Sequence, residues 1–203
     1  MKEYKSKLED KDLNKLSDEE LILEFQQNNT IAAYEILVKK YKNQLVNYVF
    51  RFIGDYEACL DIVQETMLKV YRYKDSYSSI AKFSTWIYTI AGNLARTEYQ
   101  RRKRRKFFSI NAYGENKDED YDIPDESYMP DQITDSGIKD KIIQDALMKI
   151  SDTYREVVIL RDIQGLSYEE IAEVTGLAVG TVKSRINRGR AQLQELLKDI
   201  YND

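Results

Sequence analysis

The sequence predicts an all-α protein built from two small helical domains that are joined by an acidic flexible linker. Apolar residues recur at helical spacing along most of the 203-residue chain, which contains only two prolines and eight glycines. Both prolines, Pro124 and Pro130, lie in residues 107–137, a stretch that contains nine acidic residues and a single cation, Lys117. Such a stretch favours an extended linker. We therefore expect an N-terminal extension, a first domain, the linker and a second domain at 1–16, 17–106, 107–137 and 138–203, respectively.

The composition excludes several kinds of chemistry. The chain has no histidine and one cysteine, Cys59, which rules out His-based catalytic triads, Cys/His zinc sites and internal disulfides. We expect no catalytic residue, metal or cofactor, and we expect Cys59 to be a buried apolar residue rather than a reactive thiol. The acids at 118–122 could suggest a metal site in an enzyme acting on nucleic acid, but consecutive acids in a linker are usually solvated. The charged N-terminus and the absence of a long apolar run favour a cytoplasmic protein without membrane insertion.

Four helices are expected in the first domain. Ser17 and Glu20 have the spacing of a capping box, in which each side chain binds the other residue's backbone N–H, so the first helix begins there. Gly54 is expected to end the second helix. A serine-rich loop at 75–82 then precedes the fourth helix. The expected helices span 17–27, 30–53, 56–73 and a segment that starts near 84.

The third of these helices carries two different stripes. An inner stripe at helical spacing is formed by Leu60, Val63, Met67 and Val70. A mixed polar and apolar ridge is formed by Asp61, Gln64, Glu65, Leu68 and Arg72. This ridge suits either docking on another protein or plain solvation, and the spacing alone leaves both interpretations open.

The fourth helix leads into an unbroken basic run, RRKRRK, at 101–106. Cations at the C-terminal end of a helix complement its dipole, but six in succession exceed that need and favour phosphate contacts. The net charge of −4 argues against a general polyanion binder, whereas the clustering of the cations favours a local contact. Trp86 is expected to pack in the core rather than serve as a base platform. Tyr77, with Ser78 and Ser79 beside it, is better placed to touch an unstacked base.

The second domain contains the spacing of a helix-turn-helix in LSYEEIAEVTGLAVGTVKSRINRGR, residues 166–190. Ser167 and Glu170 repeat the capping-box pattern, and Gly176 is expected to end the first helix in a left-handed conformation. The second helix has an inner stripe at Val182, Ile186, Gly189, Leu193, Leu196 and Ile200.

The opposite face of the second helix is polar and basic. It carries Lys183, Ser184, Asn187 and Arg188, flanked by Arg185 and Arg190. A helix with this face fits the major groove of DNA, where such side chains bond base edges or phosphates. An ordinary solvated face is the alternative, but the cap, glycine turn, core stripe and polar face all coincide in this segment.

Three motifs together resemble the bacterial RNA polymerase sigma factors of the extracytoplasmic-function (ECF) class, in the sigma-70 family. They are D-x-V-Q-E-T from residue 61, W-x-Y-x-I-A-x-N-L-A from residue 86 followed by the basic run, and L-S-Y-E-E-I-A with G-T-V-K-S-R in the helix-turn-helix. The resemblance implies a sigma-2-like helical bundle and a sigma-4-like helix-turn-helix domain. It implies a promoter-specificity subunit that binds core polymerase and starts transcription at a two-element promoter. Such a subunit is not an enzyme, because the polymerase performs the nucleotidyl transfer.

The resemblance also implies roles for individual residues. Docking on the clamp helices of the polymerase largest subunit is implied for Asp61, Gln64 and Glu65. Contacts to the minus-ten element are implied for Tyr77, Ser78, Ser79, Asn93, Arg96, Thr97, Arg101, Arg104 and Arg105. Contacts to the minus-thirty-five element are implied for Thr181, Lys183, Ser184, Arg185, Asn187 and Arg188.

Further partners follow from the resemblance. They are the flap of the second-largest polymerase subunit, promoter DNA, and an anti-sigma factor that could hold the protein at the membrane. The chain departs from many members of the family at Ala178, where they have proline, and at Asn187, where they carry an aromatic residue or histidine. Residues 1–16 have no clear counterpart. The alternative is a two-domain helix-turn-helix regulator that does not replace the specificity subunit, but it leaves DIVQET and the aromatic loop without a role.

Overall fold

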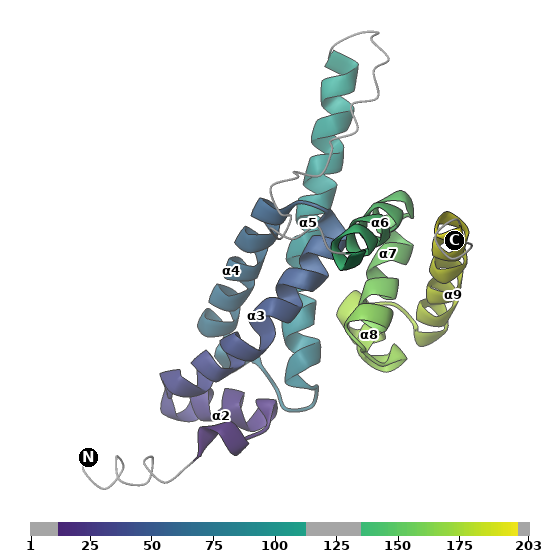
Figure 1. Cartoon of the computed structure of the whole chain (residues 1–203). Coiled ribbons are helices and arrows are strands. Elements are labelled where there is room, and N and C mark those ends of the chain that lie inside the picture. Colours follow the sequence, from purple (N-terminus) through teal and green to yellow (C-terminus); the bar gives the residue numbers. More distant parts are fainter. Residues whose placement is uncertain (1–11, 113–134, 199–203) are drawn as a thin grey trace, which may run out of the picture.

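The computed structural model describes residues 12–112 and 135–198, and these residues form helices joined by short turns and loops (Figure 1). The first part contains η1 (Leu13–Lys15), α2 (Asp18–Asn28), α3 (Ile31–Ile53), α4 (Tyr56–Arg72), η2 (Lys74–Ser76) and α5 (Phe83–Ala112). The second contains α6 (Asp135–Lys149), α7 (Asp152–Val158), η3 (Ile159–Ile163), α8 (Tyr168–Thr175) and α9 (Val179–Leu196). Within these two ranges no strand occurs, and the all-α prediction is confirmed.

Local signals set the helix ends of the first domain. The Ser17 hydroxyl accepts a hydrogen bond from the Glu20 amide at 3.2 Å, and the Glu20 carboxylate accepts one from the Ser17 amide at 2.8 Å. Gly54 ends α3 with φ of 80°, a left-handed conformation that favours glycine. The Asp55 carboxylate then caps α4 by accepting from the Ala58 amide at 2.8 Å. The predicted capping box and glycine stop are therefore confirmed.

Helix α3 is the centre of the first domain and packs against α2, α4 and α5. Its buried face includes Leu37, Leu45 and Phe52, each at most 1 % exposed. Burying a side chain of this size contributes about 1.5–3 kcal/mol. Cys59 is also buried: its thiol donates to the Val46 carbonyl at 3.2 Å, and burial raises its pKa to about 12. The prediction that Cys59 is a buried residue is confirmed.

Two residues expected on inner stripes lie at the surface. Leu60 is 41 % exposed, because the buried stripe of α4 runs through Cys59 and Ile62 and places Leu60 at its edge. Leu196 is 42 % exposed, since burial along α9 falls off from Gly189 to the last turn. The predictions for Leu60 and Leu196 are therefore wrong, whereas Ile200 lies outside the described residues.

Helix α5 is longer than the sequence suggests. It continues through the basic run to Ala112 and extends beyond the bundle (Figure 1). Residues 107–112, expected as extended linker, are helical, and so are residues 135–137 at the start of α6. The segment from 107 to 112 contains no proline to stop the helix. Both prolines and the acids at 118–122 lie outside the described residues.

The second domain contains the predicted helix-turn-helix in α8 and α9. Ser167 and Glu170 form the capping box, with hydrogen bonds of 3.1 and 2.7 Å, and Gly176 follows α8 with φ of 71°. Gly189 serves a different purpose, since a Cβ there would lie 2.6 Å from Cγ2 of Val158. The missing side chain thus lets α9 approach α7 closely. Helices α6, α7 and η3, which pack beneath the motif, were not predicted individually.

The two domains pack against each other. Helix α8 lies along α5, while α6, α7 and η3 contact α3 (Figure 1). The buried guanidinium of Arg155 joins them: it donates to the Phe52 carbonyl at the end of α3 at 2.8 Å. It also donates to three carbonyls of its own domain, those of Leu147, Met148 and Ile150. A cation at the C-terminal ends of two helices suits their dipoles. Of the helices described, none is both long and apolar enough to cross a membrane.

Candidate polymerase and nucleic-acid interfaces

The α4 ridge, defined as Asp61, Gln64, Glu65, Leu68 and Arg72, lies on the outside of the first domain. Asp61, Gln64 and Arg72 are exposed, and Leu68 is half-buried. The Glu65 carboxylate lies 3.6 Å from the Lys69 ammonium, an exposed pairing that contributes little to stability. Leu60, which sequence reasoning placed in the core, adds apolar area beside Asp61. The ridge therefore presents carboxylates and aliphatic surface together, a mixture suited to a protein partner.

The loop between α4 and α5 is tied to α2. The Gln26 amide nitrogen donates to the Lys74 and Tyr77 carbonyls at 2.5 and 3.0 Å, which fixes the start of the loop. The Tyr77 ring is buried against Trp86 at 5.3 Å between centroids, and its hydroxyl donates to the Ala81 carbonyl at 2.8 Å. Packing removes this ring from water, so Tyr77 is not open to the base contact expected of it from the sequence. Trp86 packs in the same cluster, as predicted.

The tip of this loop is fully open to solvent. Ser78 and Ser79 are exposed, as expected, and the next residue, Ile80, is 96 % exposed. A nearly fully exposed isoleucine is unusual on a surface, where large apolar groups mark contact sites when they cluster with others. Sequence reasoning missed Ile80, although an aliphatic residue that belongs to no helical stripe was the available signal.

The middle of α5 presents Asn93 and Thr97 to solvent but turns Arg96 toward the second domain. The Arg96 guanidinium donates to the Asn93 amide oxygen at 2.6 Å and to the carboxylate of Glu156 on α7. The structure thus brings Asn93, Arg96 and Thr97, three of the nine predicted minus-ten residues, together on α5. It also pairs Arg96 with a carboxylate 60 residues away, a partner that no local sequence signal identifies.

The basic run divides into paired and solvent-exposed cations. Arg101 lies 2.6 Å from the Glu98 carboxylate, whose pKa is lowered chiefly by that hydrogen bond. Arg102 binds both Glu98 and Asp55, at 2.8 and 2.6 Å. Lys103 and its neighbours Arg104 and Arg105 are exposed, with no ion pair in the part of the chain that the structure describes. Arg101 and Arg102 therefore support the fold, whereas Lys103, Arg104 and Arg105 are available to an outside anion.

Helix α9 carries its polar face to solvent. Lys183, Ser184, Asn187 and Arg188 are exposed, and Thr181 and Arg185 are half-buried. Tyr168 lies beneath this face, with the Lys183 ammonium 5.3 Å from its ring centroid and the Arg161 guanidinium 4.7 Å from it. Arg190 binds the Asp162 carboxylate through two of its nitrogens and so belongs to the domain's own structure. The exposed cations of α9 form a face that fits a groove of duplex DNA.

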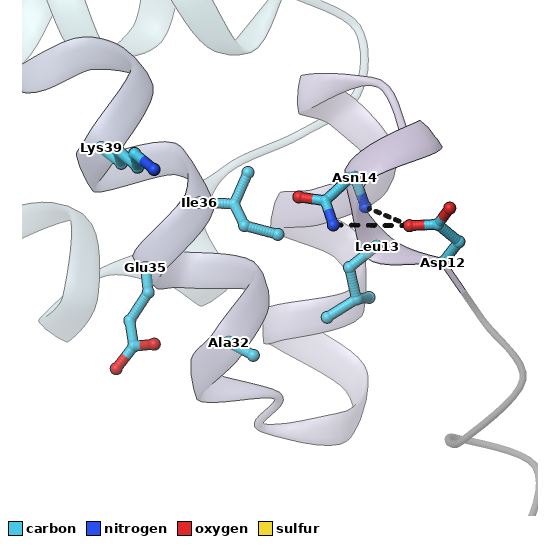
Figure 2. Close-up of a pocket in the computed structure, with 7 residues that line it drawn as sticks. All are labelled: Asp12, Leu13, Asn14, Ala32, Glu35, Ile36 and Lys39. Carbon is cyan, nitrogen blue, oxygen red and sulfur yellow. Dashed lines mark hydrogen bonds between the residues drawn. The ribbon is translucent and has the colours of Figure 1, made fainter.

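Other features of the described residues offer no competing site. A hollow of about 510 Å³ lies between η1 and α3, where Leu13 and Ile36 face each other and an Asp12–Asn14 hydrogen bond closes one edge (Figure 2). It is wide open to solvent, and no buried polar group points into it. Across residues 12–112 and 135–198, no cluster of three or more acidic or cysteine ligands could hold a metal ion. The candidate surfaces are those of α4, the loop before α5, α5 itself and α9.

These surfaces are those expected of a helical DNA-binding protein that carries, besides α9, a second basic surface and a separate mixed polar and apolar ridge. Comparisons with known proteins identify its family. Residues 37–105 match the family profile described as Sigma-70 region 2, and residues 140–193 match Sigma-70, region 4.

Individual relatives agree with the family profiles. The ECF RNA polymerase sigma factor SigW of Bacillus subtilis is 33 % identical over 169 residues, which cover 83 % of this chain and 90 % of SigW. The RNA polymerase sigma-H factor of Pseudomonas aeruginosa is 28 % identical over 202 residues, or 94 % of this chain and 99 % of that protein. The sigma factor RpoE, solved in complex with the anti-sigma factor NepR from Bartonella quintana, has a TM-score of 0.65 at 28 % identity. That match covers 81 % of this chain and 96 % of RpoE.

The chain belongs to the ECF class of RNA polymerase sigma factors. It is a promoter-specificity subunit, which works with core RNA polymerase and promoter DNA. Family membership favours this role over that of a separate helix-turn-helix regulator.

Proposed function

We propose that this sigma factor holds a two-element promoter with two domains, at 17–106 and 138–203, while the α4 ridge fixes it to core polymerase. The observation that carries the proposal is the presence of three exposed surfaces of different chemistry on one chain. They are the α4 ridge, the α5 face with Asn93, Thr97, Arg104 and Arg105, and the α9 face with Lys183, Ser184, Asn187 and Arg188. The protein itself performs no catalysis, since the nucleotidyl transfer belongs to the polymerase. Its place of action is the cytoplasm, where it joins the polymerase.

Helix α9 is the reader of the minus-thirty-five element in this proposal. Its exposed Lys183, Asn187 and Arg188 can donate to base edges and phosphates in the major groove. The cation–π contact between Lys183 and Tyr168 supports this role, because it holds the lysine stem on the domain surface. Ser184, with Thr181 and Arg185 at the border of the face, completes the contact.

The minus-ten element is assigned to the loop tip and the outer face of α5. Ser78 and Ser79 would bond an unstacked base, with Ile80 offering apolar surface against it. Tyr77 supports the loop from beneath instead of touching the base. Asn93, Arg96 and Thr97 would contact the strand, and Arg104 and Arg105 its phosphates. Arg101 contributes less, because Glu98 already neutralises it.

Protein partners follow from the α4 ridge and from the relatives. We assign Asp61, Gln64 and Glu65 to the clamp helices of the polymerase largest subunit, and the second domain to the flap of the second-largest subunit. RpoE forms a complex with the anti-sigma factor NepR. An anti-sigma factor that covers the polymerase-binding surfaces is accordingly proposed for this chain, and such a partner could hold it at the membrane.

Charge reversal on the ridge tests the proposal. Glu65→Lys should weaken binding to core polymerase at least tenfold, or by about 1.4 kcal/mol, because it places a cation where a carboxylate is proposed to meet the clamp helices. The measurement is a titration of labelled sigma factor with purified core polymerase. Glu35→Lys, an exposed charge reversal on α3, is the matched control and should bind like the wild type. Equal affinities for Glu65→Lys and the wild type would remove the ridge from the polymerase interface.

A further inference from the structure

We propose that α2 sets the base preference of the minus-ten contact, because it holds both ends of the loop whose tip would bind the unstacked base. Glu19 and Gln26 are the positioning residues, and neither touches DNA in this scheme. The inference rests on the proposed function, since it takes Ser78, Ser79 and Ile80 as the base contact. It assigns a role to a helix that carries none of the candidate surfaces.

The C-terminal end of α2 holds the start of the loop. The Gln26 side chain donates to the Lys74 carbonyl at 2.5 Å and to the Tyr77 carbonyl at 3.0 Å. In return, the Lys74 ammonium donates to the Phe25 carbonyl at 2.9 Å and to the Asn29 side chain. The same ammonium lies 4.3 Å from the centroid of the Phe25 ring. A cation at this end of a helix suits the dipole, so each segment stabilises the other.

The first turn of the same helix holds the end of the loop. The Glu19 carboxylate accepts from the backbone amide of Phe83, the first residue of α5, at 2.9 Å. This bond satisfies one of the amides that a helix leaves free at its N-terminus, and a carboxylate suits the dipole there. Glu19 and Gln26 lie about two helical turns apart and therefore project from one face of α2. A single helix thus fixes both ends of the loop.

Helix α2 is itself fixed to the body of the first domain, beside the turn from α4 into α5 (Figure 1). The Asp18 carboxylate accepts from the Lys40 ammonium at 2.7 Å and from the Tyr41 hydroxyl at 2.5 Å, both on α3. Ile22 and Phe25 of α2 are at most 1 % exposed. The helix is therefore a rigid support from which the loop takes its shape.

The underside of the loop is closed by the Tyr77 ring. This ring packs against Phe83 and Trp86, with centroids 5.9 and 5.3 Å away. Its hydroxyl donates to the Ala81 carbonyl at 2.8 Å, which joins the two sides of the tip. The tip thus projects from a loop that is held at its start, at its end and from beneath.

This support explains the exposure of Ile80. An isoleucine that is 96 % exposed would gain free energy by leaving water, so an unrestrained loop would turn it inward. The bonds from Glu19 and Gln26 oppose that rearrangement and keep the tip in one open form. A binding group that is ordered before its ligand arrives loses less entropy on binding, and it discriminates better between ligands of different shape.

The hold of α2 on the loop is measured by the emission of Trp86, the single tryptophan of the chain. Because this ring lies against Tyr77, release of the loop should expose it to water. Gln26→Met keeps an unbranched side chain of similar length without the donor, and should shift the emission to the red. Gln27→Met, at the neighbouring exposed position, is the control and should emit like the wild type. Identical spectra for Gln26→Met and the wild type would overturn the inference.

Base preference is measured on the same proteins after reconstitution with core polymerase. The probe is a DNA duplex that continues into a short single strand of random sequence, and the bound molecules are recovered and sequenced. Gln26→Met should lose preference about tenfold at one position of the single strand, the discrimination that one base contact supplies, and keep it at the others. Loss of stability alone would lower binding without changing the preference at a single position. Gln27→Met should show the wild-type preferences.

Failure of the inference and failure of the proposed function give different results. Wild-type preferences retained at every position by Gln26→Met would overturn the role of α2, whatever the emission of Trp86. A wild-type holoenzyme without base preference at any position would instead count against the minus-ten role of the loop, and with it against any specificity set through the loop.

Glu19 keeps the inference testable if Gln26→Met fails to fold. Glu19→Ala removes the acceptor of the Phe83 amide and should weaken preference at the same position of the single strand. Glu19→Gln retains a carbonyl oxygen that can accept from this amide, and should keep the wild-type preference. Glu35→Ala, an exposed change on α3, is the control. Loss of preference in both Glu19 variants, or in neither, would contradict the positioning role.

Discussion

At the scale of single residues, the cations of this chain differ in whether the protein itself neutralises them. Arg101 and Arg190 are bound to carboxylates of the chain, whereas Arg104, Arg105 and Arg188 have no carboxylate partner among the described residues. An arginine that is already paired with a carboxylate gains less free energy from a DNA phosphate, because the internal ion pair must be broken first. We therefore expect the removal of Arg104, Arg105 or Arg188, which have no carboxylate partner among the described residues, to weaken promoter binding most.

The exposed arginines should differ in the kind of binding they support. Arg188→Ala should reduce discrimination between a promoter and one altered in its minus-thirty-five element by about 1–3 kcal/mol, because a base-edge contact is lost. Replacing Arg104 and Arg105 together by alanine should weaken binding to all sequences and lower the slope against the logarithm of salt concentration by about 2. Fluorescence anisotropy of reconstituted holoenzyme on both promoters, over a range of salt, measures both effects. If the two variants weakened all sequences alike, α9 would not be the reading helix.

At the scale of elements, the position of α9 depends on one glycine. A Cβ at Gly189 would meet Val158 Cγ2 at 2.6 Å and the Tyr154 carbonyl oxygen at 3.4 Å, so α7 and α9 could not keep their present separation. Gly180, in the first turn of the same helix, has no heavy atom within 4 Å of its added Cβ. The same substitution at the two positions therefore separates packing from helix propensity.

Gly189→Ala should destabilise the protein by about 1–3 kcal/mol, the cost of overpacking a close helix contact. Gly180→Ala should be neutral or stabilising by roughly 0.5–1 kcal/mol, because alanine favours the helix more than glycine does. Urea unfolding followed by circular dichroism measures both free energies. A Gly189→Ala protein that unfolds at the same urea concentration as Gly180→Ala would show that α7 and α9 adjust without cost.

The elements that could be predicted from the sequence are those with local signals. Ser17, Ser167, Gly54 and Gly176 set helix ends through bonds within a few residues, so the pattern alone places them. Helices α7 and η3 had no such signal. Residues 157–160 are all buried, and a segment buried on every side has no period to detect. The sequence did not predict the continuation of α5 past the basic run, because residues 107–112 were grouped with the acidic segment that follows them. No proline lies in residues 107–112 to stop the helix.

At the scale of the whole molecule, the exposed helix faces were easier to predict from the sequence than the contacts between segments that lie far apart in the chain. The exposed face of α9 follows from helical period, because the buried stripe fixes the opposite side. The burial of Tyr77 and the pairing of Arg96 depend on residues far away in the chain, which spacing cannot reveal. The packing of α8 along α5 belongs to the same class, since it joins segments separated by the linker. Tertiary pairing of distant segments is therefore what the sequence left open.

The sigma role is tested most directly by in vitro transcription from a promoter library, with purified core polymerase and the wild-type chain. We expect transcripts from a subset of promoters that share two sequence elements, and loss of each transcript when either element is scrambled. Core polymerase alone should give none of these products. Transcripts identical to those of core alone, or no promoter-specific product from any member of the library, would contradict the role assigned to this chain.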